Sequence, residues 1–202
     1  MVLSRFKKLF EGLLGGLAAP LHSVGVRPNT LTAVGLAFSA SAAVLIYMHK
    51  SMPELLYPSA ALIILSGLCD ALDGTMARMF GEETPMGAFL DSLLDRYGDA
   101  VVICSVIVSG LCNPVWGVAA LVGSLLVSYA RARGESLGVQ MASVGLGERA
   151  ERLIILTTAT LIEPLVRGAL NAAVVVLAVI THATVVQRAV HFWRRRGTEG
   201  NA

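Results

Sequence analysis

Apolar residues form six long stretches along the chain, at 29–49, 54–79, 86–112, 114–136, 150–168 and 169–193. Each is close to the length of about 20 residues that a helix needs to cross a bilayer. Only Val166, Arg167 and Gly168 suggest a break between the last two stretches. The pattern predicts an all-α, polytopic membrane protein with six transmembrane helices.

The composition agrees with a chain whose surroundings are mostly lipid. Of its 202 residues, 55% are hydrophobic and only 15% are charged, and the mean hydropathy is +0.69. These values exclude an ordinary soluble domain. Because no repeat or linker interrupts the pattern, we expect a single membrane domain over residues 1–202, with the six-helix bundle at 29–193.

The segment 1–21 precedes the first apolar stretch and is amphipathic. Its large apolar residues share one helical face: Leu3, Phe6, Phe10, Leu13, Leu14 and Leu17. Charged residues interrupt the apolar run, which a cleaved signal peptide would keep continuous. The segment therefore predicts an interfacial helix that lies along the membrane surface.

The basic residues predict the orientation in the membrane. With six spans and a cytoplasmic N-terminus, all of the 16 lysines and arginines except Lys50 and Arg167 fall on the inner side. Basic residues collect on the cytoplasmic side of membrane proteins. We therefore expect a multi-pass protein of the cell membrane with both termini in the cytoplasm. This topology accounts for the net charge of +2, and no feature indicates a nucleic-acid partner.

Four aspartates interrupt the second and third stretches. Asp70 and Asp73 are three residues apart, and Asp91 and Asp95 are four apart, so each pair shares one face of its helix. A short turn joins the two helices, so the two faces are expected to meet. Ionised carboxylates near hydrocarbon are costly and repel one another, so a compensating positive charge is required.

Divalent cations best supply that charge. Clustered carboxylates suit Mg²⁺ or Mn²⁺, whereas zinc normally takes histidine or cysteine ligands, and the histidines here are isolated. Two such ions would favour displacement at phosphorus, so phosphoryl-type transfer is the leading reaction class. The alternatives are an ion or proton pathway of a transporter, buried salt bridges to Arg78 and Arg96, and a purely structural membrane subunit, which we rank last.

The aspartates belong to a longer pattern, DxxDGxxAR, eight residues, then GxxxDxxxD. It matches at Asp70, Asp73, Gly74, Ala77, Arg78, Gly87, Asp91 and Asp95. This chain resembles the CDP-alcohol phosphotransferase family, whose signature is the same pattern. The resemblance implies a six-helix homodimer that transfers the lipid phosphate of a CDP-lipid to an alcohol and releases CMP. It also implies that the four aspartates bind the metal, that Asp95 accepts the proton of the acceptor hydroxyl, and that Gly74 and Arg78 bind CDP.

Two further segments extend the resemblance. The run Arg27-Pro28-Asn29-Thr30-Leu31-Thr32 is similar to the family segment beside the nucleotide. Asn29 and Thr32 would then contact CDP, although Asn29 alone is equally typical of a helix N-cap. Thr84 is similar in position to another CDP contact.

The acceptor is expected to be an anion. Arg131, Arg149, Arg152 and Arg188 fall on the side where the aspartates emerge, and arginine suits phosphate, but positive-inside anchoring explains any single one equally well. Their segments resemble the branch of the family that makes phosphatidylinositol phosphate or its archaeal archaetidyl counterpart, with Arg131 where the bacterial branch commonly has lysine. We therefore expect inositol phosphate as acceptor and these four arginines as its phosphate contacts, with glycerol phosphate or serine as alternatives. CDP-diacylglycerol and CDP-archaeol both remain open as the lipid donor, and Asp99 has no assigned role.

Overall fold

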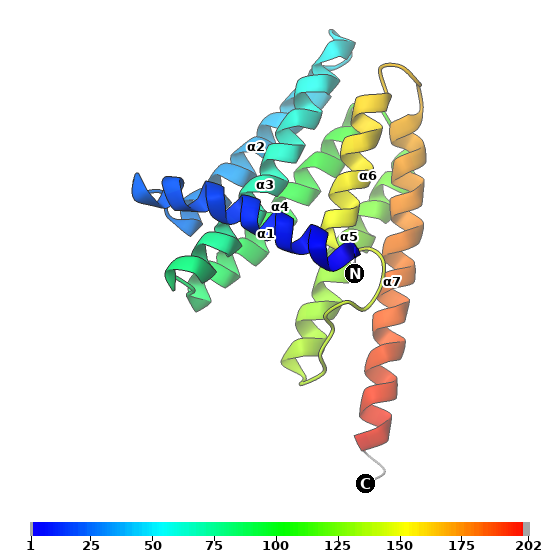
Figure 1. Ribbon diagram of the computed structural model, residues 1–202. Coiled ribbons are helices and arrows are strands. Elements are labelled where there is room, and N and C mark those ends of the chain that lie inside the picture. The colour runs from blue at the N-terminus through cyan, green and yellow to red at the C-terminus, as the bar shows by residue number, and fades with distance from the viewer. Residues whose placement is uncertain (1, 200–202) are drawn as a thin grey trace.

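The computed structural model describes the backbone of residues 2–199 and the side chains of residues 12–195. All regular secondary structure in this part of the chain is helical. The helices are α1 (Val2–Ser23), α2 (Pro28–Met48), α3 (Leu56–Phe80), α4 (Pro85–Val108), α5 (Pro114–Ser136), α6 (Arg149–Ile162) and α7 (Ala169–Glu199), with a short 3-10 turn, η1 (Pro53–Leu55), before α3. Six of them run roughly along one direction, and α1 lies across them (Figure 1).

Four of the helical segments are long and apolar enough to cross a membrane: Pro28–Met48, Pro53–Phe80, Pro114–Ser136 and Ala169–Arg195. The protein is therefore a polytopic membrane protein. The two remaining helices of the bundle differ from the expected spans. The apolar sequence of α4 is interrupted by four charged residues, Asp91, Asp95, Arg96 and Asp99. Helix α6 ends at Ile162 rather than near 168, and its 14 residues extend only about 21 Å.

Local sequence sets where the helices begin and end. Proline stands in the first turn of α2, α4 and α5, at Pro28, Pro85 and Pro114, where its missing N–H costs nothing. The Thr84 hydroxyl caps α4 by accepting a hydrogen bond from the Gly87 amide at 3.0 Å. Gly81, whose φ of +68° is left-handed, caps the C-terminal end of α3. The sharp turn between α3 and α4 follows from these two residues.

Of the two roles considered for Asn29, the helix N-cap is wrong. Arg27 occupies that position, without a side-chain hydrogen bond to the helix. Pro28 is pre-organised for the first helical position, so the helix starts two residues earlier than it would with Asn29 as its N-cap. Asn29 lies inside the first turn, where its side chain lines a cavity.

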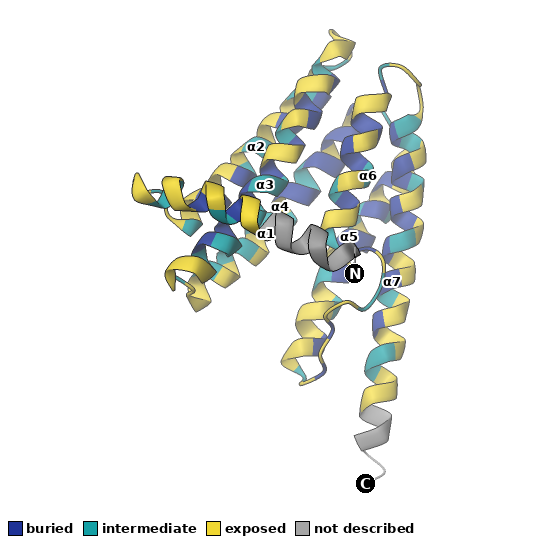
Figure 2. Cartoon of the chain, viewed as in Figure 1, coloured by how far each residue is buried: buried dark blue, intermediate teal, exposed yellow. Residues whose placement is uncertain are grey.

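The helices pack through small and aliphatic residues, while large apolar residues cover the outside. The core lies between helices, and exposed residues follow their outer faces (Figure 2). Lipid tails are as apolar as leucine, so packing rather than water exclusion holds such helices together. Helices α5 and α7 illustrate this, because a Cβ on Gly123 would overlap the Thr181 hydroxyl. Helix α4 packs between α2 and α5, and α6 packs on α3 and α7.

Helix α1 is docked on α3. Leu14 and Ala18 are buried in a small cluster with Leu72 and Met76 of α3. Leu13 and Leu17 are exposed, so the expected apolar face is divided between protein contact and the surroundings. Leu3, Phe6 and Phe10 lie outside the residues whose side chains are described. The interfacial position of α1 stays a prediction.

The turn between α6 and α7 is closed by Glu163. Its carboxylate is only 8% exposed. Its two oxygens accept hydrogen bonds from the amides of Gly168, at 2.9 Å, and Leu170, at 2.7 Å. A carboxylate at this place satisfies free amides at the start of α7 and complements the helix dipole.

Candidate active site

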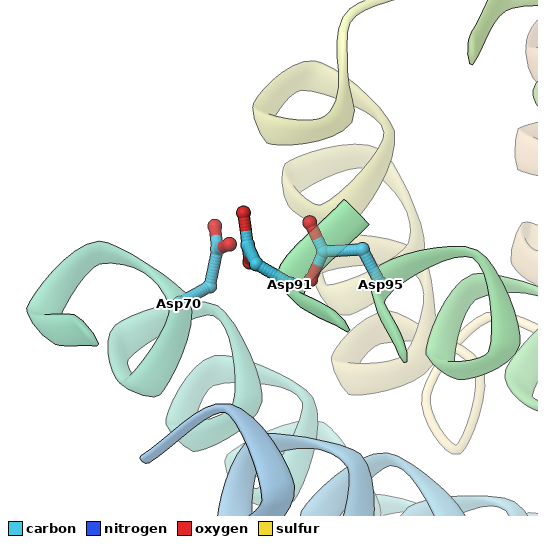
Figure 3. Close-up of side chains that lie close together, drawn as sticks. All are labelled: Asp70, Asp91 and Asp95. Atoms are coloured by element: carbon cyan, nitrogen blue, oxygen red, sulfur yellow. The ribbon is translucent and has the colours of Figure 1, made fainter. Parts of the chain in front are cut away.

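Three of the four expected aspartates meet at one point of the bundle. Asp70 extends from α3, and Asp91 and Asp95 extend from successive turns of α4 toward it (Figure 3). One carboxylate oxygen of each lies within 4.8 Å of those of the other two, and all three residues are half-buried. The spacing of four residues on α4 places Asp91 and Asp95 on the same face, as expected. We call these three residues the carboxylate triad.

Asp73 points to a neighbouring place. Its side chain is 5% exposed, and its Oδ2 accepts a hydrogen bond of 2.6 Å from the Thr32 hydroxyl on α2. It lines a cavity with Asp91 on one side of the triad. The structure thus brings Asp73 next to the triad but not into it, and its role as a metal ligand stays a prediction.

The donor set fits a hard divalent cation. The triad offers only carboxylate oxygens, the ligands that Mg²⁺ and Mn²⁺ prefer. The Oδ1 atom of Asp91 is buried and has no hydrogen-bond partner among the described residues. A buried acceptor without a donor is costly, so a cation at this point would satisfy it.

A cavity of about 160 Å³ adjoins the triad on the side of the α3–α4 turn. All five residues expected to bind CDP line it: Asn29, Thr32, Gly74, Arg78 and Thr84. We call it the nucleotide cavity. The structure brings together the start of α2, the end of α3 and the start of α4, and Asp73 and Asp91 form its floor toward the triad.

Two glycines shape this cavity. A Cβ on Gly87 would lie 3.0 Å from the Thr84 hydroxyl and 3.1 Å from Asn29 Oδ1, so glycine keeps the walls of α2 and α4 close. A Cβ on Gly74 would lie 3.3 Å from Nη1 of Arg78. The Arg78 guanidinium therefore lies directly beside Gly74.

A second cavity of about 400 Å³ lies on the other side of the triad. All four arginines expected to bind the acceptor line it, together with Arg96. Its acidic residues are Asp70, Asp91, Asp95, Asp99, Glu135 and Glu148. We call it the basic cavity, after the five guanidinium groups in its wall. Asp91 lines both cavities, so the triad stands between them.

Arg152 and Arg188 are buried and firmly held. Arg188 is 2% exposed. Its Nε donates to the Val144 carbonyl at 2.9 Å and its Nη1 to the Val127 carbonyl at 2.5 Å. Arg152 donates from Nη1 to the Gly147 carbonyl at 2.7 Å and from Nη2 to Asp99 Oδ2 at 2.6 Å. These bonds tie α6 and α7 to α4, to α5 and to the loop 137–148, which contributes Glu148 to the lining of the basic cavity.

Arg149 and Arg131 differ from these two. The guanidinium of Arg149 reaches the triad, with Nη1 2.6 Å from Asp70 Oδ2 and Nη2 3.0 Å from Asp95 Oδ1, and its Nε lies 3.6 Å from Asp99 Oδ1. Arg131 forms an exposed pair with Glu135, one turn further along α5. The structure thereby supplies partners for Asp99, which had no assigned role: it lies between Arg149 and Arg152.

Sequence reasoning missed several parts of the basic cavity. Glu148 precedes Arg149 directly and lies 3.7 Å from Arg188 Nη2. Its place within the Glu-Arg-Ala-Glu-Arg segment was the available clue. The backbone carbonyls of Val127, Val144 and Gly147, which hold the arginines, could not be predicted from the sequence, because every residue type has a backbone carbonyl.

Comparison with known proteins is consistent with this geometry. A family model described as CDP-alcohol phosphatidyltransferase matches residues 26–191. The archaetidylinositol phosphate synthase of Methanothermobacter thermautotrophicus is 41% identical over 167 residues, which cover 82% of this chain and 82% of that protein.

Solved structures agree in fold. Mycobacterium tuberculosis phosphatidylinositol phosphate synthase with CDP-DAG bound has a TM-score of 0.77 and 32% identity, covering 89% of this chain and 93% of that one. In its complex with manganese and citrate, the TM-score is 0.78 at 32% identity, with coverage of 89% and 88%. The resemblance expected from the aspartate pattern is confirmed, and the chain belongs to the CDP-alcohol phosphatidyltransferase family.

Proposed function

We propose that this membrane enzyme transfers the lipid phosphate of a CDP-lipid to a hydroxyl of an inositol phosphate and releases CMP. One observation carries the proposal: the carboxylate triad separates a small cavity with the nucleotide-binding pattern from a larger cavity lined by arginines. The names of the similar proteins, an archaetidylinositol and a phosphatidylinositol phosphate synthase, support the same donor and acceptor classes.

In the proposed reaction, the acceptor oxygen forms a bond to the phosphorus next to the lipid, and the bond from that phosphorus to CMP breaks. Arg78, with Asn29, Thr32, Gly74 and Thr84 around it, holds the CDP group in the nucleotide cavity. Two divalent cations, Mg²⁺ or Mn²⁺, would bind at the aspartates in our proposal. They would neutralise charge on the phosphate oxygens. The manganese complex of the mycobacterial relative supports this choice of metal.

Asp95 is the proposed base. It lines the basic cavity and therefore faces the side from which the acceptor enters. It takes the proton of the attacking hydroxyl, and no covalent enzyme intermediate is required. Asp70, Asp73 and Asp91 are the remaining proposed metal ligands.

The arginines of the basic cavity favour a phosphorylated acceptor. Arg152 and Arg188 are almost fully buried, and such guanidinium groups bind phosphate with directed, charge-assisted hydrogen bonds. Arg131 and Arg149 lie at the same cavity wall. Serine or free inositol would offer these arginines no phosphate to bind.

We also propose that α4 and α6 cross the membrane with the four apolar helices, giving six spans. Both termini and the active site then face the cytoplasm, and the enzyme forms a homodimer. The distribution of lysine and arginine supports this orientation. The position of α4 between α2 and α5 supports a span despite its charged residues, because these face the cavities rather than lipid.

The test is CMP release by the protein purified in detergent, with Mg²⁺ or Mn²⁺ and either CDP-diacylglycerol or CDP-archaeol. Inositol phosphate, free inositol, glycerol phosphate and serine are compared as acceptors, with Asp95→Asn as the control. We expect release with inositol phosphate alone. Release with a different acceptor would contradict the role of the basic cavity, and no metal-dependent release with any acceptor would favour a transporter.

A further inference from the structure

Arg149 holds a place that sets it apart from the other arginines of the basic cavity. Its guanidinium approaches two members of the triad, Asp70 at 2.6 Å and Asp95 at 3.0 Å, and its side chain is 18% exposed. Arg96 reaches Asp95 only at 4.0 Å. Arg149 is thus the principal positive charge that this chain places on the oxygens proposed to bind the metal.

The manner of contact also differs. Arg152 and Arg188 donate directed hydrogen bonds to backbone carbonyls. In contrast, Nε and Nη1 of Arg149 are buried and have no aligned hydrogen-bond partner among the described residues, although carboxylates lie close. The attraction between Arg149 and the triad is therefore mainly electrostatic. Directed hydrogen bonds fix the orientation of Arg149 less than they fix the orientations of Arg152 and Arg188.

The charge balance of the basic cavity determines how the contact between Arg149 and the triad affects anion binding. With every group ionised, the carboxylates in its wall outnumber the guanidinium groups by one. The wall alone is therefore poorly suited to a phosphorylated acceptor. One divalent cation reverses the sign of the balance, and any guanidinium that leaves the triad becomes available to an anion.

A cation and the guanidinium cannot share the same oxygens. A Mg²⁺ or Mn²⁺ ion sits about 2.1 Å from its ligand oxygens, in the space that Arg149 Nη1 approaches at 2.6 Å from Asp70. Like charges at such a distance repel strongly in a medium of low polarity. Arg149 is the first residue of α6, and its side chain lines the same cavity as Arg131 and Arg188, so it needs only a rotamer change to turn from the triad toward the cavity.

We propose that Arg149 competes with the divalent cation for Asp70 and Asp95, so that cation binding releases its guanidinium to the phosphate of the acceptor. Arg149 then couples the two binding events. By reciprocity, an anion in the basic cavity strengthens cation binding to the triad. The proposal rests on the metal and acceptor sites of the proposed function and adds an order to their filling, metal before acceptor.

The first test measures Mn²⁺ affinity, without substrate, from the electron paramagnetic resonance signal of free Mn²⁺. Arg149→Gln removes the competing charge, so we expect it to bind Mn²⁺ more tightly than the natural protein, by between about fivefold and a hundredfold. Arg131→Gln removes a charge from the same cavity wall but away from the triad, and we expect its Mn²⁺ affinity to change by less than about twofold. Equal or weaker Mn²⁺ binding by Arg149→Gln overturns the proposal.

Arg149→Lys and the natural protein keep the test decisive if Arg149→Gln does not fold. Lysine carries the charge at a single point and lacks the fork that spans two carboxylates, so its Mn²⁺ affinity is expected to exceed that of the natural protein. In the natural protein, inorganic phosphate is expected to tighten Mn²⁺ binding, and more so than in an Arg149 variant. Equal tightening in both overturns the coupling role. Absence of Mn²⁺ binding in every protein contradicts the proposed metal site as well, whereas equal binding contradicts only the role of Arg149.

Discussion

The nucleotide cavity and the basic cavity share Asp91 of the carboxylate triad but are built in different ways. The nucleotide cavity is formed by the start of α2 and by the α3–α4 hairpin, whose residues are close in sequence. The basic cavity collects side chains from α3 to α7, together with Glu148 of the loop 137–148. The first depends on local turn geometry, whereas the second depends on ion pairs and hydrogen bonds across the whole bundle. Substitutions in the two should therefore fail in different ways.

The largest effect is expected for a residue that belongs to both. Asp91→Asn removes a charge from the wall between the cavities, and we expect kcat/KM to fall by at least about a hundredfold for donor and acceptor alike. Because Asp91 Oδ1 has no hydrogen-bond partner among the described residues, thermal stability should fall little. CMP release and a thermal melt in detergent check this. Loss of activity toward the acceptor alone would argue against a shared wall.

The next effect should appear mainly as instability. Asp99→Asn removes the negative charge that pairs with buried Arg152, whose Nη2 lies 2.6 Å from Asp99 Oδ2. Breaking a buried pair typically costs about 3–5 kcal/mol, because the remaining charge is left uncompensated. We expect a clearly lower melting temperature and a higher KM for the acceptor, with little change in KM for the CDP-lipid. An unchanged melting temperature would mean that Asp99 does not hold the wall of the basic cavity.

A smaller effect is expected on the nucleotide side. Thr32→Val keeps the shape of the side chain but removes the 2.6 Å hydrogen bond to Asp73. Hydrogen bonds to charged groups contribute about 1.5–3 kcal/mol, so kcat/KM for the CDP-lipid should fall by roughly tenfold to a hundredfold. The KM for the acceptor should stay near its natural value. A change confined to the acceptor would reverse the assignment of the two cavities.

The smallest effect concerns the attachment of α1. His22 stacks on Phe80, with ring centroids 3.7 Å apart, and its Nε2 lies 3.2 Å from Glu82 Oε1 at the rim of the nucleotide cavity. Both side chains are partly exposed, so His22→Ala should cost about 1 kcal/mol or less. We expect a slight drop in melting temperature and less than about a threefold rise in KM for the CDP-lipid. A loss as large as that of Thr32→Val would give α1 a direct part in donor binding.

The contrast also explains what could be predicted from the sequence. All five expected nucleotide residues line one cavity because their spacing on two helices and one short turn fixes their relative positions. The four arginines line one cavity, as expected, because charged side chains on membrane helices avoid lipid and face a polar cavity instead. The meeting of Asp70 with Asp91 and Asp95 was predictable from the four-residue spacing on α4 and from the short turn that joins α3 to α4, although the sequence predicted Asp73 at the same point.

Other features depended on tertiary structure. Asp73 shares a helical face with Asp70, yet Thr32 of another helix draws its carboxylate away from the triad. Hydropathy extends to 168, but α6 ends at Ile162 because the following segment turns around Glu163. The contact of Arg149 with the triad joins residues from three helices, and no periodicity within one helix contains it.

Glu163 also links the stability of a remote turn to the precision of the basic cavity. Arg152 is carried by α6 and Arg188 by α7, and the segment around Glu163 is their covalent connection. At 1.5 Å per residue, Arg188 lies about 27 Å along α7 from Leu170, whose amide Glu163 holds. The Glu163 carboxylate therefore fixes the start of α7 relative to the end of α6. Loss of these two hydrogen bonds is expected to loosen the turn and to change the relative position of two guanidinium groups, Arg152 and Arg188, that are proposed to bind phosphate far from it.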